Sequence, residues 1–108
     1  MRAPEIISAD NGFAIVRGAD RDIVRFDEVR AVIAWKLDEL TSDLVCCEIV
    51  TDSRGGEQVR TVHEELAGFE ALMTRFAVLP GFDRQVWEAV IGRAFAADRR
   101  IIYTRGPT

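Results

Sequence analysis

The spacing of apolar residues changes near residue 66, and this change constrains the fold most. Residues 44–51 are nearly all apolar and residues 58–63 alternate, which is typical of two strands joined across the Gly55-Gly56 turn. Beyond residue 66 the apolar residues recur at helical positions i, i+3, i+4 and i+7: Phe69, Leu72, Met73 and Phe76. This pattern predicts a strand pair followed by a helix that lays one apolar stripe on the sheet.

The remaining segments extend the same scheme. Residues 13–17 and 23–26 read as a hairpin, residues 29–37 alternate as a strand, and residues 99–104 read as a short final strand. A second helix is expected after Asp83, whose side chain suits an N-cap. We therefore predict an α+β fold, an antiparallel β-meander of about five or six strands with two helices packed on one face. Residues 1–108 are expected to form a single domain, with an ordered core at about 13–105.

Composition narrows the class of partner. The chain carries a formal net charge of -4 with a pI near 5.0, so its field repels nucleic-acid phosphates and anionic lipid head groups. No apolar run is long enough to cross a membrane, and the N-terminus lacks the pattern of a secretory signal. We therefore expect a cytoplasmic protein that binds neither nucleic acid nor membrane. The adjacent Cys46 and Cys47 cannot easily bridge each other in a strand and are interpreted as reduced thiols.

An acidic end of the sheet is the first candidate site. In a meander the 38–43 loop and residues 64–65 share one end of the sheet, so Asp38 and Asp43 could approach His63 and Glu65 there. Such a set could serve a hydrolytic or metal-dependent enzyme, the alternative function that we consider. The other interpretation makes His63 a strand-end residue and places Glu64 and Glu65 near the positive N-terminus of the next helix. The chain has no cofactor-binding or metal-binding motif, so neither is expected.

Two tryptophans, Trp35 and Trp87, have two possible roles. Trp is enriched at interaction hot spots, but it is also a frequent core residue. Trp35 is in phase with Ile33 and Leu37, and Trp87 is in phase with Ile91, which favours the core for both residues. The candidate binding set is Trp35, Lys36, Asp38, Asp43, Glu64 and Trp87. A pocket of about 300 Å³ or more between sheet and helices is a further possibility. Its expected lining is Trp35, Phe69, Met73 and Trp87.

Three segments carry a resemblance to known proteins. They are Trp35-Lys36-x-Asp38-x-x-Thr41-x-Asp43-Leu44-Val45-Cys46, Val62-His63-Glu64-Glu65-x-x-Gly68-Phe69, and the terminal Arg100-Ile101-Ile102-Tyr103. The chain resembles small uncharacterised bacterial α+β proteins with W-K-x-D-x-x-T-x-D-L-[VI]-C and V-x-E-E-x-x-G-F segments, a likeness that implies no established activity. The order of strands before a helix also resembles a pleckstrin-homology or GRAM-type meander. Such domains have seven strands and one closing helix.

The expected function follows from charge and from the absence of catalytic spacing. We predict a small cytoplasmic bacterial protein-interaction module, an adaptor or immunity-like factor without catalysis. Its acidic sheet end and a helix face would meet the partner, helped by electrostatic steering. Self-association as a homodimer is the simplest version of this hypothesis, through an open strand edge at residues 13–17 or at the terminal strand.

Overall fold

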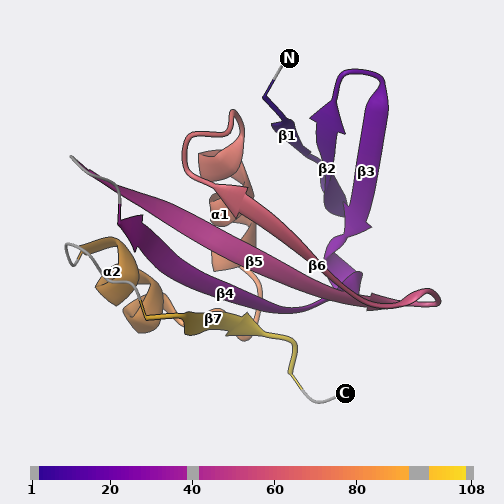
Figure 1. Cartoon of the computed structure of the whole chain (residues 1–108). Helices are drawn as coiled ribbons and strands as arrows, with labels where there is room; N and C mark the ends of the chain where they lie inside the picture. The colour runs from indigo at the N-terminus through magenta and orange to yellow at the C-terminus, as the bar shows by residue number, and fades with distance from the viewer. Residues whose placement is uncertain (1–2, 39–41, 93–97, 107–108) are drawn as a thin grey trace.

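The computed structural model describes residues 3–38, 42–92 and 98–106 (Figure 1). The elements follow in the order β1 (Glu5–Ser8), β2 (Gly12–Arg17), β3 (Asp20–Arg25), a 3₁₀ turn (Phe26–Glu28), β4 (Val29–Asp38), β5 (Asp43–Ser53), β6 (Gly56–His63), α1 (Phe69–Ala77), α2 (Arg84–Gly92) and β7 (Arg100–Thr104).

The strands form two antiparallel sheets. One has the order β1-β2-β3 and the other the order β6-β5-β4-β7. Two-residue turns close the β2-β3 and β5-β6 hairpins, where Arg17 pairs with Asp20 and Ser53 with Gly56. The predicted α+β class with antiparallel strands is confirmed. Over the described residues there are seven strands, slightly more than the expected five or six, and they are divided between two sheets.

A bulge early in β4 decides which side chains face the core. Val29 pairs with Thr51 but Ala31 pairs with Val50, so one extra residue interrupts the ladder. Beyond the bulge the buried set is Val32, Ala34 and Lys36. Trp35 is only half-buried and Leu37 is 50% exposed. The interpretation of Trp35 as a core residue in phase with Ile33 and Leu37 is therefore wrong.

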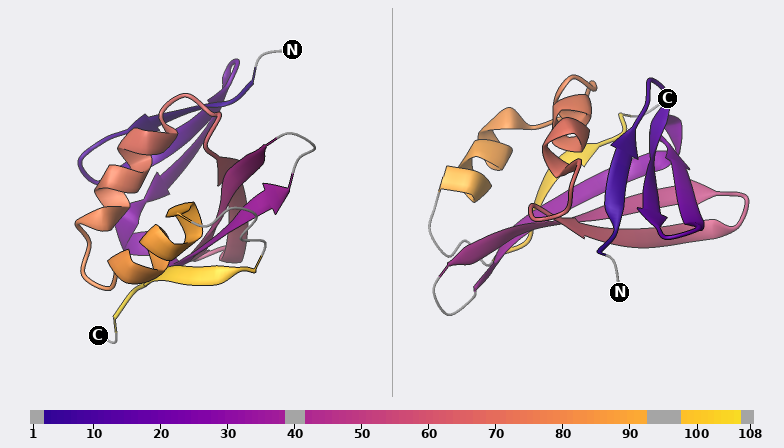
Figure 2. Two further views of the ribbon diagram at one scale, coloured as in Figure 1. Left: turned by 90° about the vertical axis from the view of Figure 1, so that its left-hand side faces the viewer. Right: turned by 90° about the horizontal axis from the view of Figure 1, so that it is seen from above.

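The core lies between the two sheets and the two helices, and both helices cover the same face of the four-stranded sheet (Figure 2). The predicted stripe of α1 is confirmed. Its buried residues are Phe69, Leu72, Met73 and Phe76. The Phe76 ring lies 6.1 Å from Phe13 and 6.2 Å from Tyr103, so this one side chain contacts both sheets. Neither described helix is long and apolar enough to cross a membrane.

The two strand edges expected to support self-association are not open. β2 is the central strand of its sheet, so both of its edges are paired. The outer edge of β7 is bonded by the segment before α2, since the Asp83 backbone N–H donates to the Ile102 carbonyl at 2.7 Å and the Thr104 N–H to the Gly81 carbonyl at 3.3 Å. Pairing with a second copy through these edges would require breaking existing backbone hydrogen bonds.

Candidate functional site: a pocket between the helices and the sheet end

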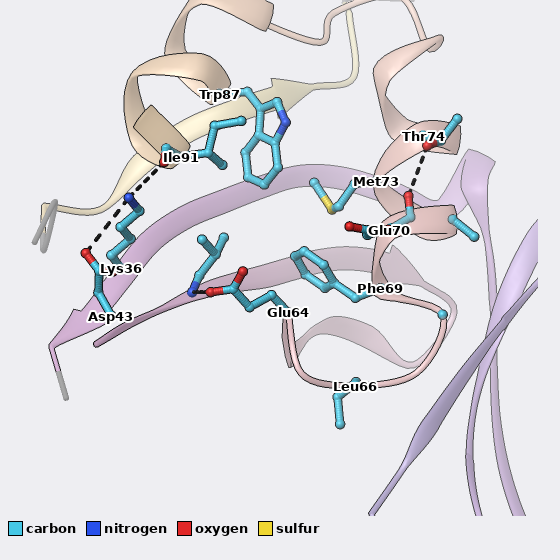
Figure 3. A pocket seen from close by; sticks show the side chains of 13 residues that line it. Lys36, Asp43, Glu64, Leu66, Phe69, Glu70, Met73, Thr74, Trp87 and Ile91 are labelled. Carbon is cyan, nitrogen blue, oxygen red and sulfur yellow. Dashed lines mark hydrogen bonds and ion pairs between the residues drawn. The ribbon is translucent and has the colours of Figure 1, made fainter. Parts of the chain in front are cut away.

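A pocket opens between α1, α2 and the end of the four-stranded sheet where β4 meets β5 (Figure 3). Its volume is about 1010 Å³. The lining residues come from five places, namely β4, the start of β5, the segment after β6, α1 and α2. They are Lys36, Asp43, Val45, Glu64, Leu66, Gly68, Phe69, Glu70, Ala71, Met73, Thr74, Trp87 and Ile91. We call this the helix–sheet pocket.

The pocket has an apolar floor and a polar, accessible rim. Phe69 and Met73 are buried and belong to the hydrophobic core, so the floor is fixed by core packing. Glu64 and Glu70 on the rim are exposed, and Ile91 is 43% exposed. An apolar floor with a few polar groups at its margin is the usual composition of a binding site.

Lys36 forms part of the wall and also fixes the end of α2. Its side chain is buried, and its Nζ donates a hydrogen bond of 2.8 Å to the Ile91 carbonyl in the last turn of the helix. The same Nζ lies 3.9 Å from the Asp43 carboxylate. The last carbonyls of a helix lack partners within the helix and carry partial negative charge, so a lysine there is favourable. The buried cation is thus compensated from within the protein.

Glu64 holds the segment after β6 against β5. Its backbone N–H donates to the Val45 carbonyl at 3.0 Å, and its Oε1 accepts a hydrogen bond of 2.8 Å from the Val45 N–H. α1 begins only at Phe69, so Glu64 precedes the first turn of the helix and is held by β5 instead. A carboxylate has more acceptor positions than this one bond uses, and Glu64 therefore retains capacity toward the pocket.

Gly68 sets the close approach of β1 to the start of α1. It adopts a φ of +89°, and a Cβ at this position would lie 1.9 Å from the Ile6 carbonyl oxygen. The Ile6 N–H also donates to the Ala67 carbonyl at 2.8 Å. Only glycine satisfies both the left-handed backbone and the contact. The first turn of α1, which carries Phe69 and Glu70 into the pocket, is therefore fixed by β1.

Trp87 enters the pocket from the opposite side, on α2. The predicted N-cap of this helix is confirmed, because the Asp83 Oδ1 accepts a hydrogen bond of 3.1 Å from the Val86 N–H. The Trp87 side chain is half-buried and packs against the core with part of its surface. The remainder faces the pocket across from Met73 (Figure 3). The helix expected after Asp83 is described as far as Gly92, and residues 93–97 lie outside the described residues.

Four of the six residues expected to bind a partner line this one pocket. They are Lys36, Asp43, Glu64 and Trp87. Trp35 lies on the other face of the sheet. There the Arg99 guanidinium lies 4.1 Å from the centre of the Trp35 ring and also forms an ion pair with Glu48. The side chain of Asp38 lies outside what the structure describes. The expected pocket of 300 Å³ or more is found with Phe69, Met73 and Trp87 in its lining, but Trp35 is not part of it.

Among the described side chains of the alternative enzymatic set, His63 and Asp43 are not brought together. His63 and Trp35 both pair with Cys46, which places His63 on the outer face of the sheet. Asp43 belongs to the inner face with Lys36. The His63 Nδ1 accepts a hydrogen bond of 3.3 Å from the Glu65 N–H, a local contact at the strand end. Among residues 3–38, 42–92 and 98–106, no group of three His, Cys, Asp or Glu side chains is placed to hold a metal ion.

Glu70 and Ile91 line the pocket but were not among the sequence candidates. Glu70 and Thr74 are spaced i, i+4 beside the apolar stripe of α1, and the Thr74 hydroxyl donates to the Glu70 carbonyl at 3.0 Å. A polar row bordering an apolar stripe was the available sequence signal for Glu70 and Thr74. The position of Ile91 depends on how α2 packs, which its own sequence does not define.

The cysteines offer no nucleophile. Both are free thiols buried in β5. Burial, together with the smaller effect of the nearby Cys46, raises the pKa of the Cys47 thiol to about 12. At neutral pH this thiol therefore stays protonated and unreactive.

Comparisons of the chain with protein-family models, curated proteins and solved structures gave no match.

Proposed function

We propose that the protein is a small cytoplasmic protein-interaction module, an adaptor or immunity-like factor, that captures a segment of another protein in the helix–sheet pocket. The observation that carries this proposal is the combination of a core-anchored apolar floor with an accessible rim contributed by both helices. Binding and not catalysis is proposed, because Lys36 is engaged with the Ile91 carbonyl and Asp43, and Glu64 accepts a hydrogen bond from the Val45 N–H.

The width of the opening favours a macromolecular partner. Small-molecule sites usually enclose most of their ligand. Here five lining residues are exposed, so a ligand resting on them would keep much of its own surface in solvent. These are Glu64, Glu70, Ala71, Thr74 and Ile91. Such a depression suits side chains presented by a larger protein, with the remainder of that protein covering the rim.

The side chains in the pocket suit an interface anchor. Tryptophan is enriched at interaction hot spots, and a half-buried Trp87 has apolar surface left to cover. Met73 beside it is flexible and polarisable, so it can adapt to the shape of a partner. The homodimeric version has less support, because β2 is central and the β7 edge is already bonded.

The proposal is tested by selecting peptides from a random-peptide phage library on the purified protein. Ala71→Trp fills the pocket from the exposed face of α1 and should abolish capture of the selected peptides. Thr61→Trp adds the same side chain to the exposed outer face of β6 and is the matched control. Circular dichroism verifies that both variants are folded.

Capture by the wild type and by Thr61→Trp but not by Ala71→Trp supports the proposal. If no peptide is enriched, or if the enriched peptides bind Ala71→Trp equally well, the pocket is not the docking site and the proposal fails.

A further inference from the structure

The charge of the helix–sheet pocket is unbalanced among the described residues. Its lining carries one cation, Lys36, against the carboxylates of Asp43, Glu64 and Glu70. Lys36 donates to the Ile91 carbonyl and lies beside Asp43, so these groups serve the fold. The negative charge that remains at the pocket mouth belongs to Glu64 and Glu70.

Glu64 and Glu70 reach the same opening from two different elements (Figure 3). Glu64 follows β6 and is oriented by its hydrogen bond from the Val45 N–H. Glu70 lies in the first turn of α1, and no ion pair of its carboxylate is found within the described part of the chain. Two carboxylates at one opening attract a cationic group and repel an anionic one.

The floor beneath these carboxylates is apolar and aromatic. Phe69, Met73 and Trp87 surround a space that can take a hydrocarbon chain. Lysine and arginine combine such a chain with a charged end, and they bury the chain against apolar surface while the charge stays near water. The Trp87 ring adds a favourable face for a cation. A bare metal ion would gain no favourable contact from these apolar walls.

From this match of charge and surface we infer that the pocket recognises a lysine or arginine side chain, flanked by apolar residues, on the partner protein. The aliphatic stem lies against Phe69, Met73 and Trp87, and the cation lies between Glu64 and Glu70. This inference rests on the proposed function, because it names the chemistry of the segment that the pocket captures.

The test uses a synthetic peptide taken from the phage selection and a copy in which its lysine or arginine residues are replaced by norleucine. Binding is followed by tryptophan fluorescence in a Trp35→Phe background, where Trp87 is the only tryptophan. The norleucine peptide is expected to bind about tenfold or more weakly, since a hydrogen-bonded charged group contributes roughly a factor of ten or above.

Variants of the protein test whether Glu64 and Glu70 bind the cation of the peptide. Glu64→Gln keeps an oxygen that can accept from the Val45 N–H, and Glu70→Gln alters an exposed side chain, so both should fold. Each is expected to raise the Kd about threefold, in the range of exposed ion pairs, and the double variant about tenfold. Asp20→Asn changes the net charge equally at the exposed β2-β3 turn and is expected to leave the Kd unchanged.

The possible failures are distinguishable. One failure is that Ala71→Trp abolishes peptide binding while the norleucine peptide binds as tightly as the original, or while the glutamine variants bind the peptide as tightly as the wild type. In that case the inference is wrong and the proposed function stands. If Asp20→Asn weakens binding as much as Glu70→Gln, the effect is one of overall charge and the inference is again wrong. If no selected peptide depends on the pocket, the proposed function itself fails.

Discussion

Two glycines with nearly the same backbone angle test how α1 is fixed against β1. Gly68 has a φ of +89° and Gly56 a φ of +95°, so an alanine meets the same unfavourable left-handed backbone at both positions. Their surroundings differ. A Cβ at Gly56 meets nothing within 4 Å, whereas one at Gly68 would lie 1.9 Å from the Ile6 carbonyl oxygen. Comparing the two alanine variants therefore separates backbone strain from the steric contact.

The expected costs follow from these contacts. Gly56→Ala should lower the free energy of unfolding by about 1–2 kcal/mol, the usual cost of placing an L-residue in the left-handed region. In Gly68→Ala the carbonyl must also move away. That movement weakens the bond from the Ile6 N–H to the Ala67 carbonyl and partly uncovers the buried Ile6 side chain. Together these effects should lower the free energy of unfolding of Gly68→Ala by roughly 3–5 kcal/mol.

Urea unfolding followed by circular dichroism measures both values. Gly68→Ala should also weaken peptide binding, since it displaces the first turn of α1 and with it Phe69 and Glu70. Equal destabilisation by the two variants would refute the packing of β1 on α1 described above.

Further predictions concern the thiols and α2. The pKa of the buried Cys47 thiol is raised from 9.0 to about 12, so between these pH values the unfolded chain holds fewer protons than the folded one. The free energy of unfolding should therefore fall with rising pH, by about 1.4 kcal/mol per unit from this group, and Cys47→Ala should make that slope shallower in urea titrations. Because Cys46 and Cys47 are both buried, a thiol-specific reagent should label neither in the folded protein and both in denaturant; rapid labelling under native conditions would contradict their placement. Asp83→Ala removes the acceptor for the Val86 N–H and should destabilise the protein by about 1 kcal/mol in thermal melts, a loss that an uncapped helix would not show.

The parts of the fold that could be predicted were those with a strong local pattern. The α1 stripe repeats over two turns and faces one core, so Phe69, Leu72, Met73 and Phe76 were identified correctly. The N-cap at Asp83 is a local side-chain bond and was predicted from residue type alone. The shared sheet end of Asp43 and Glu64 followed from the meander, because the position of connections depends on strand order only.

The errors arose where pairing or packing overrides the local pattern. The alternation of β4 continues through Arg30 without a visible break, but the bulge there reverses which residues face the core. Trp35 therefore lies on the outer face, and Lys36 lines the pocket. One interpretation placed Glu64 near a helix N-terminus. A turn precedes Gly68, α1 begins only at Phe69, and Glu64 is bonded to Val45.

The two tryptophans give the most direct test of the central claim, because one lies on each side of the sheet. In ¹⁵N NMR spectra each indole N–H gives its own signal, and a peptide selected by the phage experiment can be titrated while both are observed. If the helix–sheet pocket is the docking site, the Trp87 signal shifts with increasing peptide and the Trp35 signal stays in place. A shift of Trp35 with Trp87 unchanged would place binding on the outer face and contradict the account.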